Sequence, residues 1–326
     1  MAFLNFRSRP YGDPVIDWLR PLGSTGLTVS AVCAGTAVLG SMPELFGYEV
    51  PAQRAIDTVT RVLAGPISFL DTSNGYCDGE SERRIGAALA QAAGAPDGFV
   101  LATKVDPDGD DFSGARVRRS IEESLARLGL SRVPLLYLHD PERISFADAT
   151  APGGPVEELL RIRDEGLAEH VGVAGGPVEL MERYVRTGAF EVLLTHNRWT
   201  LLDRSAGALL DAAVERGVAV VNAACFGGGI LVKGSAASDR YAYRTAHPDV
   251  LAAVRAMEDA CVRHGVPLAA AALQFSLRDP RIASTVVGFS RPERVDECVA
   301  HARTTIPEAL WRELDALVPS TELWQH

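Results

Sequence analysis

The sequence is short of lysine, has no paired cysteines and contains no long apolar run. Lys104 and Lys233 are the only lysines among 32 basic residues. The five cysteines form no CxxC pair, which fits free thiols in a reducing compartment better than a disulfide framework or a zinc site. No apolar stretch reaches the roughly 20 residues that a membrane-spanning helix needs, so no membrane partner is expected.

The sequence also has no excess of positive charge. Its 42 acidic residues outnumber the 32 basic ones, and the net charge of −10 argues against nucleic acid as a partner. The charges are interspersed, which is typical of a solvated acidic surface. The first ten residues lack the apolar length of a signal peptide. We therefore expect a cytoplasmic protein, monomeric or weakly homo-oligomeric, that acts on a small molecule.

Strand-like and helix-like segments alternate along the chain. The predicted strands are short apolar runs that cover 29–34, 67–71, 98–104, 133–139, 169–174, 190–196, 217–222 and 282–287. Segments with helical spacing of apolar residues cover 51–64, 81–93, 114–128, 155–164, 177–187, 204–215, 248–264 and 267–277, with two more from Pro292 and over 307–317.

This alternation predicts an α/β fold, a single (β/α)8 TIM barrel. Alternating βα units imply a parallel sheet, and eight of them imply closure into a barrel. An open doubly wound sheet competes with this reading, but no GxGxxG motif follows the first strand. We expect one domain over 1–326 with its core at about 20–315, an irregular or hairpin segment before it and an outer helix at the C-terminal end.

Three consecutive predicted strands end in residues that carry chemistry. Asp71 ends one strand and Tyr76 lies in the loop after it, while Lys104 and His139 end the next two. The C-terminal ends of barrel strands face one pocket, and neighbouring strands lie about 4.8 Å apart. The four side chains are therefore expected to converge.

These four residue types suit proton transfer to or from a carbonyl or alcohol oxygen. An ammonium near a tyrosine stabilises the phenolate and lowers its pKa, and a carboxylate anchors the ammonium. A histidine beside the reacting oxygen orients it or shares its proton. Each type alone is more often structural, but the combination favours a site. With no good nucleophile and no metal-ligand cluster in the sequence, acid/base chemistry with an external electron carrier remains.

The sequence resembles the aldo-keto reductase family over roughly residues 20–315. The matching motifs are DTSNGY-x-x-GESE, LATK, LYLHDPE, GVAVVNAACFGGGIL and VVGFSRPERVDEC, in the family's strand order. LLTHNRWTLLDR and the VNAA segment look most like the aldose dehydrogenase branch, the galactose and fucose type of sugar 1-dehydrogenases. The resemblance implies a catalytic tetrad of Asp71, Tyr76, Lys104 and His139, with Tyr76 as general acid/base.

The resemblance also implies an NAD(P)(H) cofactor that lies across the barrel mouth. Its contacts would come from strand ends, from the glycine-rich segment near 226–231 and from the helix that starts near Pro292, whose free N–H groups suit a phosphate. The implied cofactor-binding residues are Gly35, Thr36, Asp71, Ala174, His196, Asn197, Ala223, Phe226, Gly227, Gly229, Leu231, Gly288, Ser290, Arg294, Glu297 and Cys298.

Several positions depart from the family's common pattern. His196 stands where many members have a glutamine, Ala223 where many have a tyrosine stacked on the nicotinamide, and Cys298 where an asparagine is common. Gly288 replaces a frequent lysine or other polar residue. Arg294 occupies a position that often contacts a 2′-phosphate, which favours NADP(H) over NAD(H).

The substrate pocket is expected to be shaped by aromatic residues on loops. Tyr48 and Trp199 are the candidates for substrate contact, in a set with Phe46, Phe226, Tyr241 and Tyr243. The connection over 226–246 is long enough to form a mobile lid. The substrate itself is left open, as is the reactivity of Cys77.

Three functions fit these patterns. The leading one is an NAD(P)-dependent oxidoreductase that interconverts a carbonyl and an alcohol, or oxidises an aldose at C1. The alternative is a cofactor-sensing, non-catalytic regulatory subunit of the same fold. An isomerase or dehydratase with redox-neutral chemistry is the third.

Overall fold

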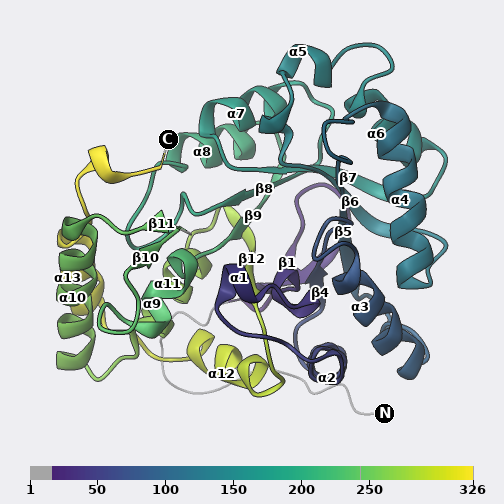
Figure 1. Cartoon of the computed structure of the whole chain (residues 1–326). Helices are drawn as coiled ribbons and strands as arrows, with labels where there is room; N and C mark the ends of the chain where they lie inside the picture. The colour runs from purple at the N-terminus through teal and green to yellow at the C-terminus, as the bar shows by residue number, and fades with distance from the viewer. Residues whose placement is uncertain (1–16, 243, 326) are drawn as a thin grey trace.

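The computed structural model describes residues 17–242 and 244–325, and a closed parallel barrel lies at its centre (Figure 1). The strands run in the order β12-β3-β4-β5-β6-β7-β8-β9 around the barrel. They are β3 (Val32–Gly35), β4 (Phe69–Asp71), β5 (Val100–Val105), β6 (Val133–His139), β7 (Ala168–Gly175), β8 (Val192–His196), β9 (Ala219–Ala223) and β12 (Ile282–Gly288). The predicted (β/α)8 barrel is confirmed.

Helices surround the barrel and cover its outer face (Figure 1). The longer ones are α2 (Ala52–Leu63), α3 (Glu80–Gln91), α4 (Gly114–Leu128), α6 (Pro155–Asp164), α7 (Val178–Arg186), α8 (Gly207–Glu215), α10 (Pro248–Arg263), α11 (Leu268–Leu277), α12 (Glu293–Ala302) and α13 (Glu308–Ala316). Helix α13 packs against α10, outside the βα units. This is the predicted outer helix.

Helix α4 illustrates why the sequence folds in this way. Val117, Ile121 and Leu128 recur at helical spacing and are buried against the barrel. The Ser113 hydroxyl caps the helix by accepting a hydrogen bond from the backbone N–H of Arg116. Gly129 ends the helix in the left-handed conformation with φ of 70°, which glycine adopts without strain.

An antiparallel hairpin closes the N-terminal end of the barrel. It consists of β1 (Leu19–Pro21) and β2 (Thr28–Ser30). Leu22, between the two strands, is fully buried with Phe69 and Val100, the first residues of β4 and β5. The predicted strand 29–34 is therefore two strands, because the chain leaves the hairpin at Ser30 and enters the barrel at Val32.

The long connection after β9 is more structured than the sequence indicated. It contains α9 (Ile230–Lys233) and a two-stranded sheet of β10 (Arg240–Tyr241) and β11 (Arg244–Thr245). Tyr241 is buried in this connection. Tyr243, one of the predicted pocket aromatics, and the Phe46 side chain lie outside the described residues. Two more short helices, α1 (Pro43–Phe46) and α5 (Phe146–Ala149), also lie in loops.

The interior of the barrel is filled by side chains. Apolar residues of alternate strand positions pack there, and Gly172 on β7 leaves the space that the ring of Tyr137 on β6 occupies. Above this layer, Asp71 and Lys104 are buried at the C-terminal ends of their strands. In the described part of the chain, no helix has both the length and the apolar character to cross a membrane.

We predict that the close approach of α3 to α4 does not tolerate a methyl group at Gly86. A Cβ at Gly86 would overlap the backbone carbonyl oxygen of Arg127, so Gly86→Ala should lower the free energy of unfolding by about 1–3 kcal/mol. Gly207→Ala is the matched control, because its Cβ would lie 3.5 Å from the Trp199 ring, an ordinary contact. Urea unfolding of both variants measures the difference. Equal stabilities would contradict this packing.

Candidate active site

Lys104 lies at the centre of a buried hydrogen-bond network. Its Nζ donates to Asp71 Oδ2 at 2.6 Å, to the Thr72 carbonyl oxygen at 2.7 Å and to Tyr76 Oη at 3.0 Å. An ammonium has three N–H donors, and each has an acceptor here. The Lys104 side chain is 2% exposed. The network therefore fixes the ammonium in one position and orientation.

The barrel's register brings these residues together. Asp71 on β4 pairs with Ala102 on β5. Lys104 lies two residues after Ala102 on β5, and its side chain therefore lies on the same face of the sheet as that of Ala102. Beyond the end of β4, Thr72 N–H donates to the Ala102 carbonyl and Asn74 N–H to the Lys104 carbonyl. These bonds continue the β4–β5 hydrogen-bond ladder into the loop and place Tyr76 beside Lys104.

The chain turns sharply after Tyr76 to begin α3. Cys77, Asp78 and Gly79 all have positive φ, at 53°, 52° and 79°, a conformation that is uncommon outside glycine. The Ser81 hydroxyl then donates to the Thr36 carbonyl oxygen at 2.9 Å. The loop that carries Tyr76 is thus tied to the end of β3, and Cys77 is a half-buried thiol whose pKa burial raises.

Burial and charge act in opposite directions on Tyr76. Burial raises the pKa of Tyr76 above its ordinary value, and the Lys104 ammonium only partly offsets this effect. Burial lowers the pKa of Lys104, but Asp71 and Tyr76 together outweigh burial and the net pKa is raised. The lowering of the tyrosine pKa by lysine that the sequence suggested is therefore present but is not the larger effect. Tyr76 remains a protonated phenol at neutral pH.

His139 lies at the end of β6 beside Tyr76. The two rings meet edge to face with centroids 5.8 Å apart and planes at 80°. His139 Nδ1 is 2.6 Å from Asp106 Oδ1 and 3.1 Å from Ser73 Oγ. The structure thus brings together all four of the residues that the sequence singled out.

Asp106 is a site residue that the sequence analysis missed. It follows β5 and lies two positions after Lys104, so strand alternation was the available signal. Its carboxylate also accepts hydrogen bonds from the Ser73 hydroxyl and from the Gly75 N–H. Burial would raise the pKa of Asp106, but His139 and these donors lower it to about 2.

A second polar cluster lies next to His139. Asp140, Glu142 and His196 each bring one potential ligand atom to within 4.8 Å of the other two, although the sequence showed no such cluster. Burial lowers the pKa of His196 to about 4, so its ring is neutral, and burial raises the pKa of Glu142. Three groups of this kind also occur without an ion, and we assign no metal here.

Several of the predicted cofactor residues line the same C-terminal rim. Ala174 on β7 pairs with His139, and Ala223 on β9 pairs with His196. Gly35 and Thr36 follow β3, and the Thr36 hydroxyl donates to the Asp71 carbonyl oxygen at 2.9 Å. The strand ends thus bring these positions close to the tetrad.

Asn197, also on this rim, has an unsatisfied acceptor. It is 3% exposed and has a positive φ of 62°. Its Nδ2 lies 3.1 Å from His196 Nδ1, whereas its buried Oδ1 has no hydrogen-bond partner among the described residues. A buried amide oxygen without a donor is unusual in proteins, and an N–H group of a ligand would satisfy it.

The glycine-rich segment after β9 is shaped by its own packing. Gly227, Gly228 and Gly229 have φ of 58°, 76° and 103°, and a Cβ at Gly227 would lie 2.7 Å from the Tyr241 ring. The N–H groups of Gly227, Gly229 and Leu231 donate to carbonyl oxygens of Ala224 and Phe226 within the segment. These three N–H groups are therefore structural.

The segment from the end of β12 into α12 carries five of the predicted cofactor-binding residues, Gly288, Ser290, Arg294, Glu297 and Cys298. A Cβ at Gly288 would meet no atom within 4 Å, so the chain leaves open space after β12, in the segment that continues through Ser290. Glu297 Oε2 accepts a hydrogen bond from Arg294 at 2.7 Å, and Oε1 accepts one from Arg291 at 3.4 Å. Cys298 is buried against the barrel.

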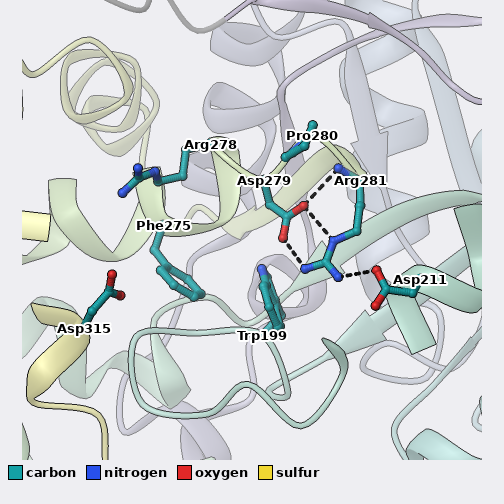
Figure 2. Close-up of a pocket in the computed structure, with 8 residues that line it drawn as sticks. All are labelled: Trp199, Asp211, Phe275, Arg278, Asp279, Pro280, Arg281 and Asp315. Carbon is teal, nitrogen blue, oxygen red and sulfur yellow. Dashed lines mark hydrogen bonds and ion pairs between the residues drawn. The ribbon is translucent and has the colours of Figure 1, made fainter. Parts of the chain in front are cut away.

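Trp199 packs against a residue of α11 and one of the turn before β12. Its ring is 5.6 Å from that of Phe275 on α11 and is covered by the Arg281 guanidinium at 4.8 Å. Figure 2 shows it in a surface pocket with these two residues and with Asp211 of α8. The indole thus packs among the outer helices. Tyr48, in the loop after α1, is 41% exposed.

A parallel barrel with a buried Asp–Lys–Tyr network at its C-terminal end has the architecture of a barrel enzyme. The sequence model of the Aldo/keto reductase family matches residues 31–319, and the chain belongs to this family. It is an oxidoreductase, and members of the family use NAD(P)H.

Two relatives and one solved structure resemble the chain over most of its length. It is 31% identical to D-threo-aldose 1-dehydrogenase of Pseudomonas sp., in an alignment that covers 89% of this chain and 94% of the relative. It is 33% identical to L-galactose dehydrogenase of Arabidopsis thaliana, over 86% and 87%. An aldo-keto reductase from Bacillus halodurans in its holo form superposes with a TM-score of 0.77 at 20% identity, over 92% and 96%. The likeness to that structure concerns the fold.

We predict that Lys104 and Asp71 depend on each other for burial. Lys104→Met should lower the free energy of unfolding by about 3–5 kcal/mol, because it leaves a buried carboxylate without its cation. The double variant Lys104→Met/Asp71→Asn should recover part of this loss, because neither charge remains. Urea unfolding of the two single variants and the double variant gives the coupling energy. Additive losses would contradict a buried ion pair.

Proposed function

We propose that this enzyme interconverts a carbonyl and an alcohol, with Tyr76 as the group that exchanges a proton with the reacting oxygen. The observation that carries the proposal is the Lys104 ammonium, which joins the Asp71 carboxylate to the Tyr76 hydroxyl. This ammonium stabilises the phenolate that forms when Tyr76 gives up its proton. Asp71 keeps Lys104 charged in a buried position.

The two directions of the reaction use the same groups. When a carbonyl is reduced, the Tyr76 hydroxyl donates its proton to the carbonyl oxygen. When an alcohol is oxidised, the phenolate takes the proton back. The raised pKa of Tyr76 keeps its proton available at neutral pH, which supports the role of donor. His139, edge to face with Tyr76, contacts the same oxygen.

We propose a nicotinamide dinucleotide as the cofactor, held across the C-terminal rim of the barrel. When bound, it supplies or accepts the hydride. The unsatisfied Oδ1 of Asn197 suits the carboxamide N–H₂ group, and the open space at Gly288 suits a ligand that extends toward α12. Ala223, at the end of β9 between β8 and β12, contributes only a methyl group to the rim between these points.

The substrate class follows from the relatives and is a further part of the proposal. D-threo-aldose 1-dehydrogenase and L-galactose dehydrogenase are named for sugars, so we propose that this enzyme oxidises an aldose at C1 or acts on a simpler aldehyde or ketone. Asp140 and Glu142, next to His139, offer carboxylate oxygens that accept hydrogen bonds from hydroxyl groups. The aldose reading is thus consistent with the chemistry of the rim.

We predict that Tyr76→Phe removes turnover and spares cofactor binding. The rate of nicotinamide absorbance change should fall by at least about 100-fold, because general acid/base catalysis contributes on this order. Cofactor affinity, measured by fluorescence titration, should stay within about twofold. Tyr184→Phe on α7, where the hydroxyl has no partner among the described residues, is the control that should keep its rate. Undiminished turnover in Tyr76→Phe would contradict the role of Tyr76 as the group that exchanges a proton with the substrate.

We further propose that NADP(H) is preferred over NAD(H), with Arg294 as the contact to the 2′-phosphate. Arg294 and Arg291 are both half exposed at the start of α12 and share Glu297 as their partner. Arg294→Ala should raise KM for NADP(H) about tenfold, the loss expected for one charge-assisted contact. KM for NAD(H) should change little. Arg303→Ala, at the other end of the helix, is the control, and equal effects on both coenzymes would exclude this role.

A further inference from the structure

Asp106 is held by hydrogen bonds to three parts of the chain, two of which contact its carboxylate. Its Oδ1 is 2.6 Å from His139 Nδ1, at the end of β6. Its Oδ2 accepts hydrogen bonds from the Ser73 hydroxyl and, at 2.7 Å, from the Gly75 N–H, both in the loop after β4. The backbone N–H of Asp106 donates to Ser120 Oγ on α4 at 3.0 Å. The carboxylate therefore has one fixed position and orientation.

This position determines the proton on the histidine ring. An ionised carboxylate only accepts hydrogen bonds, so the nitrogen that faces Asp106, Nδ1, carries a hydrogen. The other ring nitrogen, Nε2, is left to face the rim, 3.7 Å from Asp140 Oδ1. The edge-to-face contact, with ring centroids 5.8 Å apart, holds the imidazole beside the ring of Tyr76.

The charged and titratable groups around His139 come from four strand ends and the loops that follow them. Asp106 and Asp140 favour the protonated ring, and Lys104 opposes it. Asp71, Tyr76, Glu142 and His196 also face this region. Burial lowers the pKa of His139, but Asp106 and Asp140 together outweigh burial and Lys104, so the net pKa is raised.

We propose that Asp106 is a positioning residue that fixes the ring of His139 and keeps it cationic, so that its Nε2–H is donated to the reacting oxygen beside Tyr76. This inference rests on the proposed function, since it names the residue that positions His139, one of the four residues of the proposed catalytic tetrad. The substrate oxygen then lies between a neutral phenol and an imidazolium. A cation at this point stabilises the negative charge that develops on the oxygen, and Asp106 contributes without touching the substrate.

The sign of the pH dependence follows from this arrangement. A histidine with a raised pKa stays protonated above its ordinary value of about 6.5 and loses its proton only at higher pH. In Asp106→Asn the carboxylate is gone, so burial and Lys104 should bring the pKa of His139 below that value. The alkaline limb of kcat/KM should therefore move to lower pH by at least about one unit, while kcat/KM in the acidic range falls much less.

The experiment compares Asp106→Asn, Asp106→Glu and Asp108→Asn with the unchanged enzyme. Asp106→Glu keeps a carboxylate and should keep the alkaline limb, even with a lower rate. Asp108→Asn makes the same chemical change at an exposed position two residues further along and should leave both rate and profile unchanged. A uniform loss of rate in Asp106→Asn at every pH, with no shift of the limb, would show that Asp106 is only structural and would overturn the proposal.

A measurement on the unchanged protein decides the same point independently of activity and of how the variants fold. An NMR titration of the histidine ring signals, with His139 assigned through His139→Gln, should give a pKa above about 6.5 and a hydrogen on Nδ1. A lower pKa or a hydrogen on Nε2 alone in the neutral ring would overturn the proposal. If the protein shows this titration but no turnover with any nicotinamide coenzyme, the proposed function fails and the assignment of Asp106 to His139 stands.

Discussion

The buried ammonium of Lys104 is the constraint on which the rest of the site depends. A charge costs several kcal/mol to bury unless it is paired and fully hydrogen-bonded, and here three acceptors satisfy its three N–H groups. Those acceptors belong to the end of β4 and to the loop that follows it. A single interaction thus couples the barrel wall to the position of the Tyr76 hydroxyl. The lysine is nearly alone of its kind in this chain, and an arginine could not satisfy the same compact geometry.

The site combines two carboxylate pairs on neighbouring strand ends, one with a lysine and one with a histidine. Lys104 pairs with Asp71, and His139 pairs with Asp106. Tyr76 contacts Lys104 through its hydroxyl and His139 through its ring. The Lys104 ammonium lies next to the phenol, an arrangement that suits an oxygen on which negative charge develops. Burial keeps the phenol protonated until it transfers its proton to that oxygen.

Much of the fold and the four residues of the tetrad could be predicted because they follow strong periodic signals. Apolar strands that end in Asp71, Lys104 and His139 specify both the barrel and the side on which these residues meet. Asp106 was missed because a single aspartate after a strand looks like a turn former until its histidine partner is placed. The separation of β2 from β3 at Ala31 depends on a tertiary contact. The Ser30 hydroxyl donates to the Val32 carbonyl oxygen and accepts a hydrogen bond from the Ser68 N–H. Trp199 follows a strand end, but the ring contacts of Phe275 and Arg281 turn it toward the outer helices.

The central claim, that this site transfers a hydride between a nicotinamide coenzyme and a carbonyl or alcohol, is tested most directly by nicotinamide absorbance over time. The four coenzyme forms are each combined with a panel of aldoses, aldehydes and ketones. The account predicts turnover with at least one pair, and reduction of the oxidised coenzyme by an aldose would assign the substrate class at once. Tight coenzyme binding without turnover across the whole panel would contradict the account and favour a regulatory subunit that senses the coenzyme.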